Sequence, residues 1–330
     1  MKIITCAGYF NTGSTAITDF FTEFDNIKSL GETEFRFLQD PDGVQALETN
    51  LIDHPHRHNT SHAIKRFLKA SKFENGNIFS KRYRRVFGDN YMRLTKEYIN
   101  NITQLISPTH WRYDYVERGE LFYMIDALVS VITSKFGNNH RVSLLNLTGE
   151  LGYFTGISRE DFYTATKQYT SSLFDSLGEG YDYLMVDQLV PPTDVTRYLN
   201  YVNDLYVITV ERDPRDIYIL VREIKHYSVL PHNVADFCKW FKITRQHRKT
   251  DPECKRNLMV HFEDIIYDYD NTANKLMDFI GEDISHHIAP FTKLNPEISI
   301  KNSRLWTKTS EFEKEIKYIE KELKEYLYEI

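Results

Sequence analysis

The chain has 330 residues, of which 41% are hydrophobic and 27% charged, which is enough to bury the core of one large or two modest domains. Its 41 Lys and Arg against 47 Asp and Glu give a net charge of −6, which argues against a general nucleic-acid binder. No apolar run approaches the roughly 18 residues that span a bilayer. The N-terminus lacks a signal peptide's apolar region, and the three cysteines are too few for a disulfide framework. We therefore expect a cytoplasmic protein without a membrane span.

Short β-type runs and amphipathic segments follow one another along the chain. Lys2–Ala7 predicts a first strand, Thr15–Phe24 a helix and Ile27–Leu30 a second strand. Helices are then expected at Val44–Ile52, Ser61–Ser71, Asn90–Ile106 and Glu120–Phe136, and strands at Arg141–Leu147, Tyr183–Val186, Tyr206–Val210 and Asn257–His261. The helix-like segments that follow these strands are Arg159–Leu177, Asp194–Tyr201, Val234–Arg248 and Thr272–Ile280, and the C-terminal Glu311–Ile330 predicts a closing helix. This alternation predicts an α/β fold with a central parallel sheet flanked by helices.

No repeat or Pro/Gly-rich linker marks a domain boundary in the sequence. We expect one domain over residues 1–330, with a mostly helical insertion after the second strand at about 42–140. Such an insertion would lie over the carboxyl edge of the sheet, where ligands bind in folds of this kind. It would then cover the side on which an acceptor substrate enters.

A loop between the first strand and the first helix has the composition of an anion site. Gly8 and Gly13 bracket the turn, so backbone N–H groups can converge on an anion at the helix N-terminus. Ser14 and Thr15 add hydroxyl donors. The spacing is that of the nucleotide P-loop, but Ser14 stands where that motif has Lys, which disfavours hydrolysis of a nucleoside triphosphate. A strand-to-helix turn capped by Ser and Thr is the alternative interpretation.

A second candidate site follows the strand near residue 210. Arg212 ends this apolar strand, and Asp213-Pro214 starts a turn into a helix. A fixed guanidinium at the carboxyl end of a central strand suits a second phosphate. The alternative is an ion network at the start of a helix, formed with Asp213, Arg215 and Asp216.

Together the two motifs resemble the sulfotransferases that use 3′-phosphoadenosine 5′-phosphosulfate (PAPS) and release 3′-phosphoadenosine 5′-phosphate (PAP). The segment Gly8–Ala16 is similar to their 5′-phosphosulfate loop, and Arg212–Asp216 to their 3′-phosphate segment. Weaker likenesses are Leu258–Ile266, Asp278–Gly281 and a basic segment with Trp at Lys301–Trp306, and the run around Glu34–Arg36 resembles a bacterial branch of the family. The resemblance implies a P-loop-like sulfotransferase fold and no metal. It also implies cofactor contacts from Phe10, Asn11, Thr12, Gly13, Ser14, Thr15, Arg212, Tyr218, Lys301 and Arg304.

The chain departs from the family pattern at two positions. Asn11 stands where the family's loop commonly carries Lys, so another cation must serve, from the candidates Arg36, Lys65, Lys301 and Arg304. Leu220 stands where the family commonly has Ser, and Tyr218 is the candidate replacement contact. For the base that deprotonates the acceptor, carbohydrate-type members use a carboxylate just after the second strand, which favours Glu34 and then Glu32. A histidine base is the remaining alternative.

The sequence therefore predicts a sulfotransferase that moves a sulfuryl group from PAPS to a hydroxyl of a carbohydrate or glycoconjugate. Sulfuryl transfer is an in-line displacement that requires a base and donors to the moving group, here Glu34, Glu32, Asn11 and Arg36. Two alternatives stay open: a nucleotide-dependent kinase or phosphotransferase, and a PAP-binding protein that has lost activity. The sequence does not define the acceptor or the oligomeric state.

Overall fold

The computed structural model describes residues 1–31, 33–76, 82–136, 143–223 and 229–329. It divides into two compact units, one formed by residues 1–39 and 170–330 and the other by residues 40–169. No helix among the described residues is long and apolar enough to cross a membrane.

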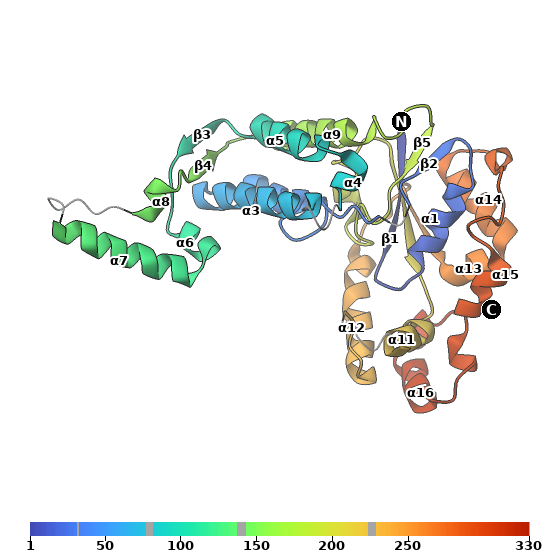
Figure 1. The fold of residues 1–330 in the computed structure, drawn as a ribbon. Helices are drawn as coiled ribbons and strands as arrows, with labels where there is room; N and C mark the ends of the chain where they lie inside the picture. Colours follow the sequence, from blue (N-terminus) through green and yellow to red (C-terminus); the bar gives the residue numbers. More distant parts are fainter. Residues whose placement is uncertain (32, 77–81, 137–142, 224–228, 330) are drawn as a thin grey trace. The chain divides into compact units, whose positions relative to one another are not determined.

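The first unit is built on a five-stranded parallel sheet of order β2-β5-β1-β6-β7 (Figure 1). This confirms the predicted α/β fold with a central parallel sheet flanked by helices. Its strands are β1 (Lys2–Gly8), β2 (Ile27–Ser29), β5 (Tyr183–Met185), β6 (Leu205–Glu211) and β7 (Asn257–His261). Its helices are α1 (Ser14–Thr22), α10 (Val195–Tyr198), α11 (Pro214–Glu223), α12 (Val234–Gln246), α13 (Phe262–Tyr267), α14 (Tyr269–Ile280), α15 (Pro296–Ser299) and α16 (Glu313–Glu322).

Alternate residues of the strands enter one large apolar core. Ile4 and Cys6 of β1 pack with Phe20 and Phe21 of α1, and α13 and α14 complete this cluster. A second cluster joins α11, α12 and α16 around Phe237. Parallel strands that are buried on both faces are apolar nearly throughout. Strands β1 and β6 are neighbours in the sheet, and Gly8 pairs with Val210, so the carboxyl ends of the two strands lie side by side.

The second unit is mostly helical and contains a two-stranded antiparallel sheet, β3-β4. Its elements are α2 (Val44–Glu48), a π-helical turn (Thr49–Asp53), α3 (Arg57–Asn75), α4 (Arg84–Phe87), α5 (Asn90–Ile102), β3 (Leu105–Pro108), α6 (Tyr113–Arg118), α7 (Glu120–Phe136), α8 (Leu144–Leu147) and β4 (Leu151–Phe154). Helix α9 (Arg159–Phe174) runs across the boundary between the units.

The strand predicted at Arg141–Leu147 is wrong over its described part, because Leu144–Leu147 forms helix α8. Ser143 caps this helix by accepting a hydrogen bond from the backbone N–H of Leu145 at 3.2 Å, a contact that favours a helix start over an extended run. Helix α5 ends at Ile102, earlier than predicted, since strand β3 begins at Leu105. The antiparallel pair that β3 forms with β4 was not predicted.

Candidate functional site

The loop between β1 and α1 contains several residues with positive φ. Phe10 has φ 93°, Asn11 has φ 53° and Gly13 has φ 88°, so three of its residues lie in the left-handed region. Left-handed residues within a turn can direct consecutive backbone N–H groups toward one concave side, as in anion-binding nests. Helix α1 begins directly after the loop at Ser14, and its first N–H groups add to the same positive end.

Both glycines of this loop are required by close packing. A Cβ on Gly8 would lie 2.5 Å from Thr12 Oγ1, and a Cβ on Gly13 would overlap the ring of Phe262. The left-handed φ of Gly13 adds a conformational reason for glycine at that position. The Gly8 and Gly13 spacing noted in the sequence is therefore a packing requirement as well as a motif.

The loop lines a cavity of about 620 Å³ that also receives Arg212. The two predicted anion sites, which lie about 200 residues apart in the sequence, thus border one space, as the neighbouring ends of β1 and β6 require. The lining residues are Gly8 to Thr15, Glu34, Arg36, Gln39, Gln188, Pro192, Arg212 and Val229.

Arg212 is held rigidly in this wall. It is only 5% exposed, and its Nη1 donates to the backbone oxygen of Asn11 at 3.4 Å. Its Nη2 donates to the backbone oxygen of Asn302, and the guanidinium lies 4.4 Å from the ring centroid of Phe262. Burial lowers the pKa of Arg212, while nearby carboxylates, led by that of Asp216, act in the opposite direction. Among the described residues its Nε–H has no hydrogen-bond partner, so donors remain for an anion.

Asn11 presents an amide rather than a cation to this region. Its Nδ2 is buried and has no hydrogen-bond partner in the described part of the chain. A buried donor without a partner is costly unless a ligand or water accepts from it. Asn11 can therefore donate to an anion in the loop cavity.

Two more of the predicted catalytic residues line the same cavity as Asn11. Glu34 and Arg36 both line it, and Glu34 Oε2 lies 3.9 Å from Arg36 Nη1. Their side chains are 54% and 39% exposed, respectively. Glu32, the other candidate base, lies outside the described residues.

Three predicted cofactor contacts lie elsewhere. Tyr218 is buried in the α11–α12–α16 cluster, where its hydroxyl donates to the backbone oxygen of His232 at 3.2 Å. Lys301 is exposed in the short turn that follows α15. Arg304 lines a second cavity, and Lys65, a candidate cation, is in the second unit with Nζ 2.5 Å from Asp114 Oδ1.

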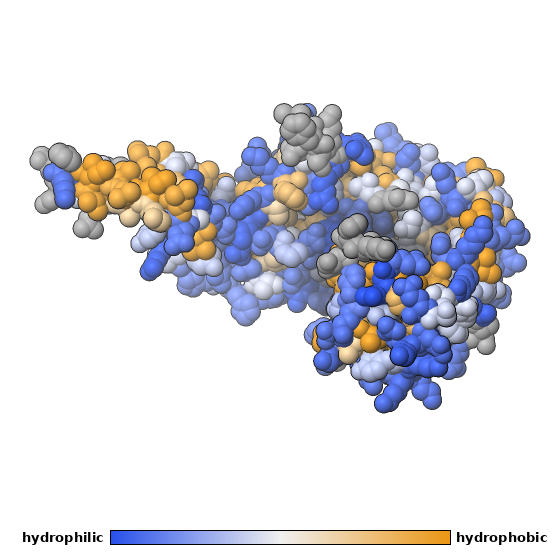
Figure 2. All heavy atoms as spheres, turned by 60° about the horizontal axis from the view of Figure 1, so that its bottom comes forward, coloured by the Kyte–Doolittle hydropathy of each residue, from blue (hydrophilic) through white to orange (hydrophobic). Residues whose placement is uncertain are grey.

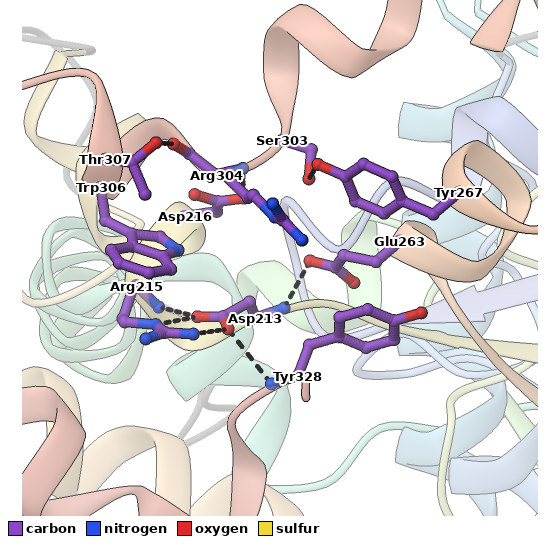
Figure 3. A pocket seen from close by; sticks show the side chains of 10 residues that line it. All are labelled: Asp213, Arg215, Asp216, Glu263, Tyr267, Ser303, Arg304, Trp306, Thr307 and Tyr328. Atoms are coloured by element: carbon purple, nitrogen blue, oxygen red, sulfur yellow. Dashed lines mark hydrogen bonds and ion pairs between the residues drawn. The ribbon is translucent and has the colours of Figure 1, made fainter. Parts of the chain in front are cut away.

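The second cavity, of about 240 Å³, is formed by the 213–216 turn, α13 and the C-terminal segments (Figure 3). The side chains of Arg304 and Glu263 point toward each other across it. The buried carboxyl of Glu263 accepts from the N–H of Asp213 at 3.0 Å, and burial raises its pKa to about 7. The lining residues are Asp213, Arg215, Asp216, Glu263, Tyr267, Ser303, Arg304, Trp306, Thr307 and Tyr328.

The sequence did not indicate as site residues Gln39 and Val229, which line the loop cavity, or Phe262, which packs against its wall. Phe262 packs against Gly13 and Arg212, and Gln39 lines the cavity while its Nε2 donates to the backbone oxygen of Gln188 at 2.6 Å. Phe262 falls inside the run Leu258–Ile266 that was singled out, so its position directly after β7 was an available signal. No pattern marked Gln39.

Among the described residues, no group of three or more His, Cys, Asp or Glu side chains could hold a metal ion. Two histidines near Pro55, His56 and His58, make local contacts within the second unit. His56 accepts from the N–H of His58 at 3.4 Å at the start of α3, and the His58 ring stacks on Trp111 at 3.5 Å between centroids.

The chain matches no family model and no curated protein. Three of the solved structures to which it is similar, all at low identity, are as follows. The first is sulfotransferase STF1 from Mycobacterium tuberculosis, at 11% identity and a TM-score of 0.38, over 92% of this chain and 76% of that one. The second is a retinol dehydratase solved with androsterone and the inactive cofactor PAP, at 14% identity and a TM-score of 0.35, over 98% and 81%. The third is sulfotransferase STF9 from Mycobacterium avium, at 10% identity and a TM-score of 0.34, over 92% and 68%.

Proposed function

We propose that this protein is a PAPS-dependent sulfotransferase that sulfates a hydroxyl group of a carbohydrate or glycoconjugate. One observation carries the proposal: the loop between β1 and α1 and the Arg212 guanidinium border the same cavity of about 620 Å³. PAPS has two separate anionic groups on one adenosine, the 5′-phosphosulfate and the 3′-phosphate. A ligand of this kind needs two anion sites on one cavity.

The proposal gives each site a role. The backbone N–H groups of the loop and the Asn11 amide hold the 5′-phosphosulfate, assisted by Ser14 and Thr15. Arg212 holds the 3′-phosphate with the donors that its two carbonyl partners leave available. Lys301 and Arg304 flank Asn302, whose carbonyl accepts from Arg212, so their segment is the one that closes over the cofactor.

The chemistry follows from the groups on the cavity wall. PAPS supplies the sulfuryl group when bound. Glu34 accepts the proton of the acceptor hydroxyl, whose oxygen forms a bond to sulfur while the bond from sulfur to the 5′-phosphate oxygen breaks and PAP leaves. Arg36, next to Glu34, and the loop donors stabilise the negative charge on the moving sulfuryl group.

The nucleotide part of the proposal is tested by thermal unfolding with PAP. At about 100 times its dissociation constant, a ligand that binds only the folded state adds about 2.7 kcal/mol to the free energy of unfolding. We expect this gain in the wild type and its loss in Arg212→Ala. The matched control is Arg215→Ala, which removes a neighbouring guanidinium that pairs with Asp213 at 2.6 Å and does not line the loop cavity.

The measured quantity is the gain on adding PAP within each variant, so a lower basal stability of Arg212→Ala does not affect the result. Equal stabilisation by ATP would contradict the role given to the 3′-phosphate. Sulfuryl transfer is tested with PAPS and a panel of glycans. PAP binding without transfer to any of them would favour a binding protein that has lost activity.

A further inference from the structure

Helix α7 (Glu120–Phe136) carries a long apolar stripe on its surface. Six of its apolar side chains are between 45% and 71% exposed, namely Leu121, Met124, Ile125, Leu128, Val131 and Ile132. Figure 2 shows hydrophobic side chains gathered at the left of the view, over this helix. Leu121, Met124, Leu128 and Val131 are spaced alternately by three and four residues, as in the seam of a coiled coil, and Ile125 and Ile132 widen the stripe. Exposed apolar stripes of this extent mark interaction sites.

The opposite side of α7 is fixed to its own unit. Asp126 is only 6% exposed and accepts from the Tyr115 hydroxyl at 2.6 Å and the Ser143 hydroxyl at 3.1 Å. It also accepts from the backbone N–H of Leu144. At about 100° per residue, Asp126 lies on the far side of the helix from Leu121 and Leu128. The buried carboxylate therefore holds α7 with its apolar stripe outward.

We infer that α7 pairs with α7 of a second copy of this chain, in antiparallel orientation about a two-fold axis near Leu128. Glu120 begins the helix and Lys135 lies in its last turn, and both are exposed beside the stripe. Antiparallel pairing brings each Glu120 opposite Lys135 of the partner subunit, so the charges match at both ends. A two-fold interface of this kind is complementary to itself.

The size and composition of the stripe fit this partner. Its six side chains expose on the order of 600 Å² of surface, which approaches the roughly 800 Å² per partner of a standard protein interface. Helices that lie on membranes instead carry several Lys or Arg on their polar face. Between Leu121 and Ser134 the only charged residue of α7 is Asp126, which faces its own unit.

The first test measures molar mass by light scattering over a range of micromolar concentrations. We expect a dimer for the wild type. Leu128→Glu brings two like charges together at the axis, and we expect it to raise the dimer dissociation constant on the order of 100-fold or more. The matched control is Ile243→Glu on α12, which replaces another apolar residue that is 60% exposed, and it should remain dimeric. Circular dichroism checks that each variant is folded.

The orientation is tested by charge exchange and by crosslinking. Glu120→Lys or Lys135→Glu alone should weaken the dimer, and the double exchange should restore it. Leu128→Cys should form an intermolecular disulfide. Leu121→Cys should not, because its two copies are then about 20 Å apart along the helices, beyond disulfide reach.

A monomeric wild type at these concentrations would overturn the inference, and so would a dimer that Leu128→Glu leaves intact. Efficient crosslinking of Leu121→Cys would overturn the antiparallel arrangement. Flotation of the wild type, but not of Leu128→Glu, with vesicles of phosphatidylcholine and phosphatidylglycerol would assign the stripe to a membrane surface instead. None of these outcomes depends on sulfotransferase activity.

Discussion

Glu263 should make the free energy of unfolding depend on pH, and a single substitution at this position should remove that contribution. Its side chain is 2% exposed and burial raises its pKa from 4.5 to about 7. One oxygen accepts from the N–H of Asp213 at 3.0 Å, while the other has no partner among the described residues. Glu263→Gln has the same shape and keeps a carbonyl oxygen for the Asp213 N–H. The variant differs from the protonated wild type mainly in that it cannot become charged.

The sign and size of the effect follow from the raised pKa. Well below pH 4.5 the carboxyl is protonated in both the folded and the unfolded state, so it does not change the free energy of unfolding. As the pH rises from 4.5 to 7, ionisation is easier in the unfolded chain, so the free energy of unfolding falls. A pKa raised by about 2.5 corresponds to a loss of about 3 kcal/mol once the pH is above 7. We therefore expect Glu263→Gln to exceed the wild type by about 1 kcal/mol at pH 5 and by about 3 kcal/mol at pH 8.

The assay is urea unfolding of the ligand-free protein between pH 5 and 8, with the difference between variant and wild type taken at each pH. Other titrating groups then cancel. Glu253→Gln, at an exposed position, is the control and should give a difference that does not change with pH. If Glu263→Gln were less stable than the wild type at pH 8, the carboxylate would be held charged by the nearby arginines, and the reasoning from burial would be refuted.

Two further predictions concern the loop itself. Gly13→Ala should lower the free energy of unfolding by about 3 kcal/mol, because of the left-handed backbone and the overlap with Phe262. Gly31→Ala is the control, since Gly31 has φ 71° and nothing lies within 4 Å of the new Cβ, and urea unfolding should show a loss of only about 1 kcal/mol. Equal losses would show that the overlap with Phe262 does not contribute to the cost. Asn11→Asp keeps the size of the side chain but brings a negative charge to the anion site. Calorimetry should therefore show that the dissociation constant of PAP rises by about tenfold or more. An unchanged dissociation constant would place the phosphosulfate away from Asn11.

The sheet could be predicted because its strands are short apolar runs followed by helical patterns. Asn257–His261 matches the predicted strand at both ends, and the strand Leu205–Glu211 extends its prediction by one residue on each side. The antiparallel pair β3-β4 could not be predicted in the same way. Its strands are only four residues long and far apart in the sequence, and β3 is mostly exposed, so they lack the alternation of apolar and polar residues that identifies a half-buried strand.

The candidate site was predictable where it depends on backbone and topology. The glycine spacing and the order of strand and helix placed the loop, and parallel strands with adjacent carboxyl ends placed Arg212 beside it. Side-chain direction was not predictable. Tyr218 and Arg304 belong to segments that approach the site, yet one is buried in the α11–α12–α16 cluster and the other lines the second cavity. Spacing in sequence does not determine the face on which a single side chain emerges from a turn.

The run from Arg212 to Asp216 serves the fold and the proposed site through different residues. Asp216 accepts from the N–H groups of Arg304 and Leu305 at 2.8 and 2.7 Å and so fixes the C-terminal segment. Arg215 and Asp213 pair with each other at 2.6 Å. A helix-start ion network, the alternative interpretation of this run, therefore exists in the structure.

Arg212 differs because it bonds to backbone carbonyls rather than to a carboxylate, and it alone of the run lines the loop cavity. A buried guanidinium without a paired carboxylate retains the capacity to bind an anion, so the assignment of the 3′-phosphate depends on Arg212.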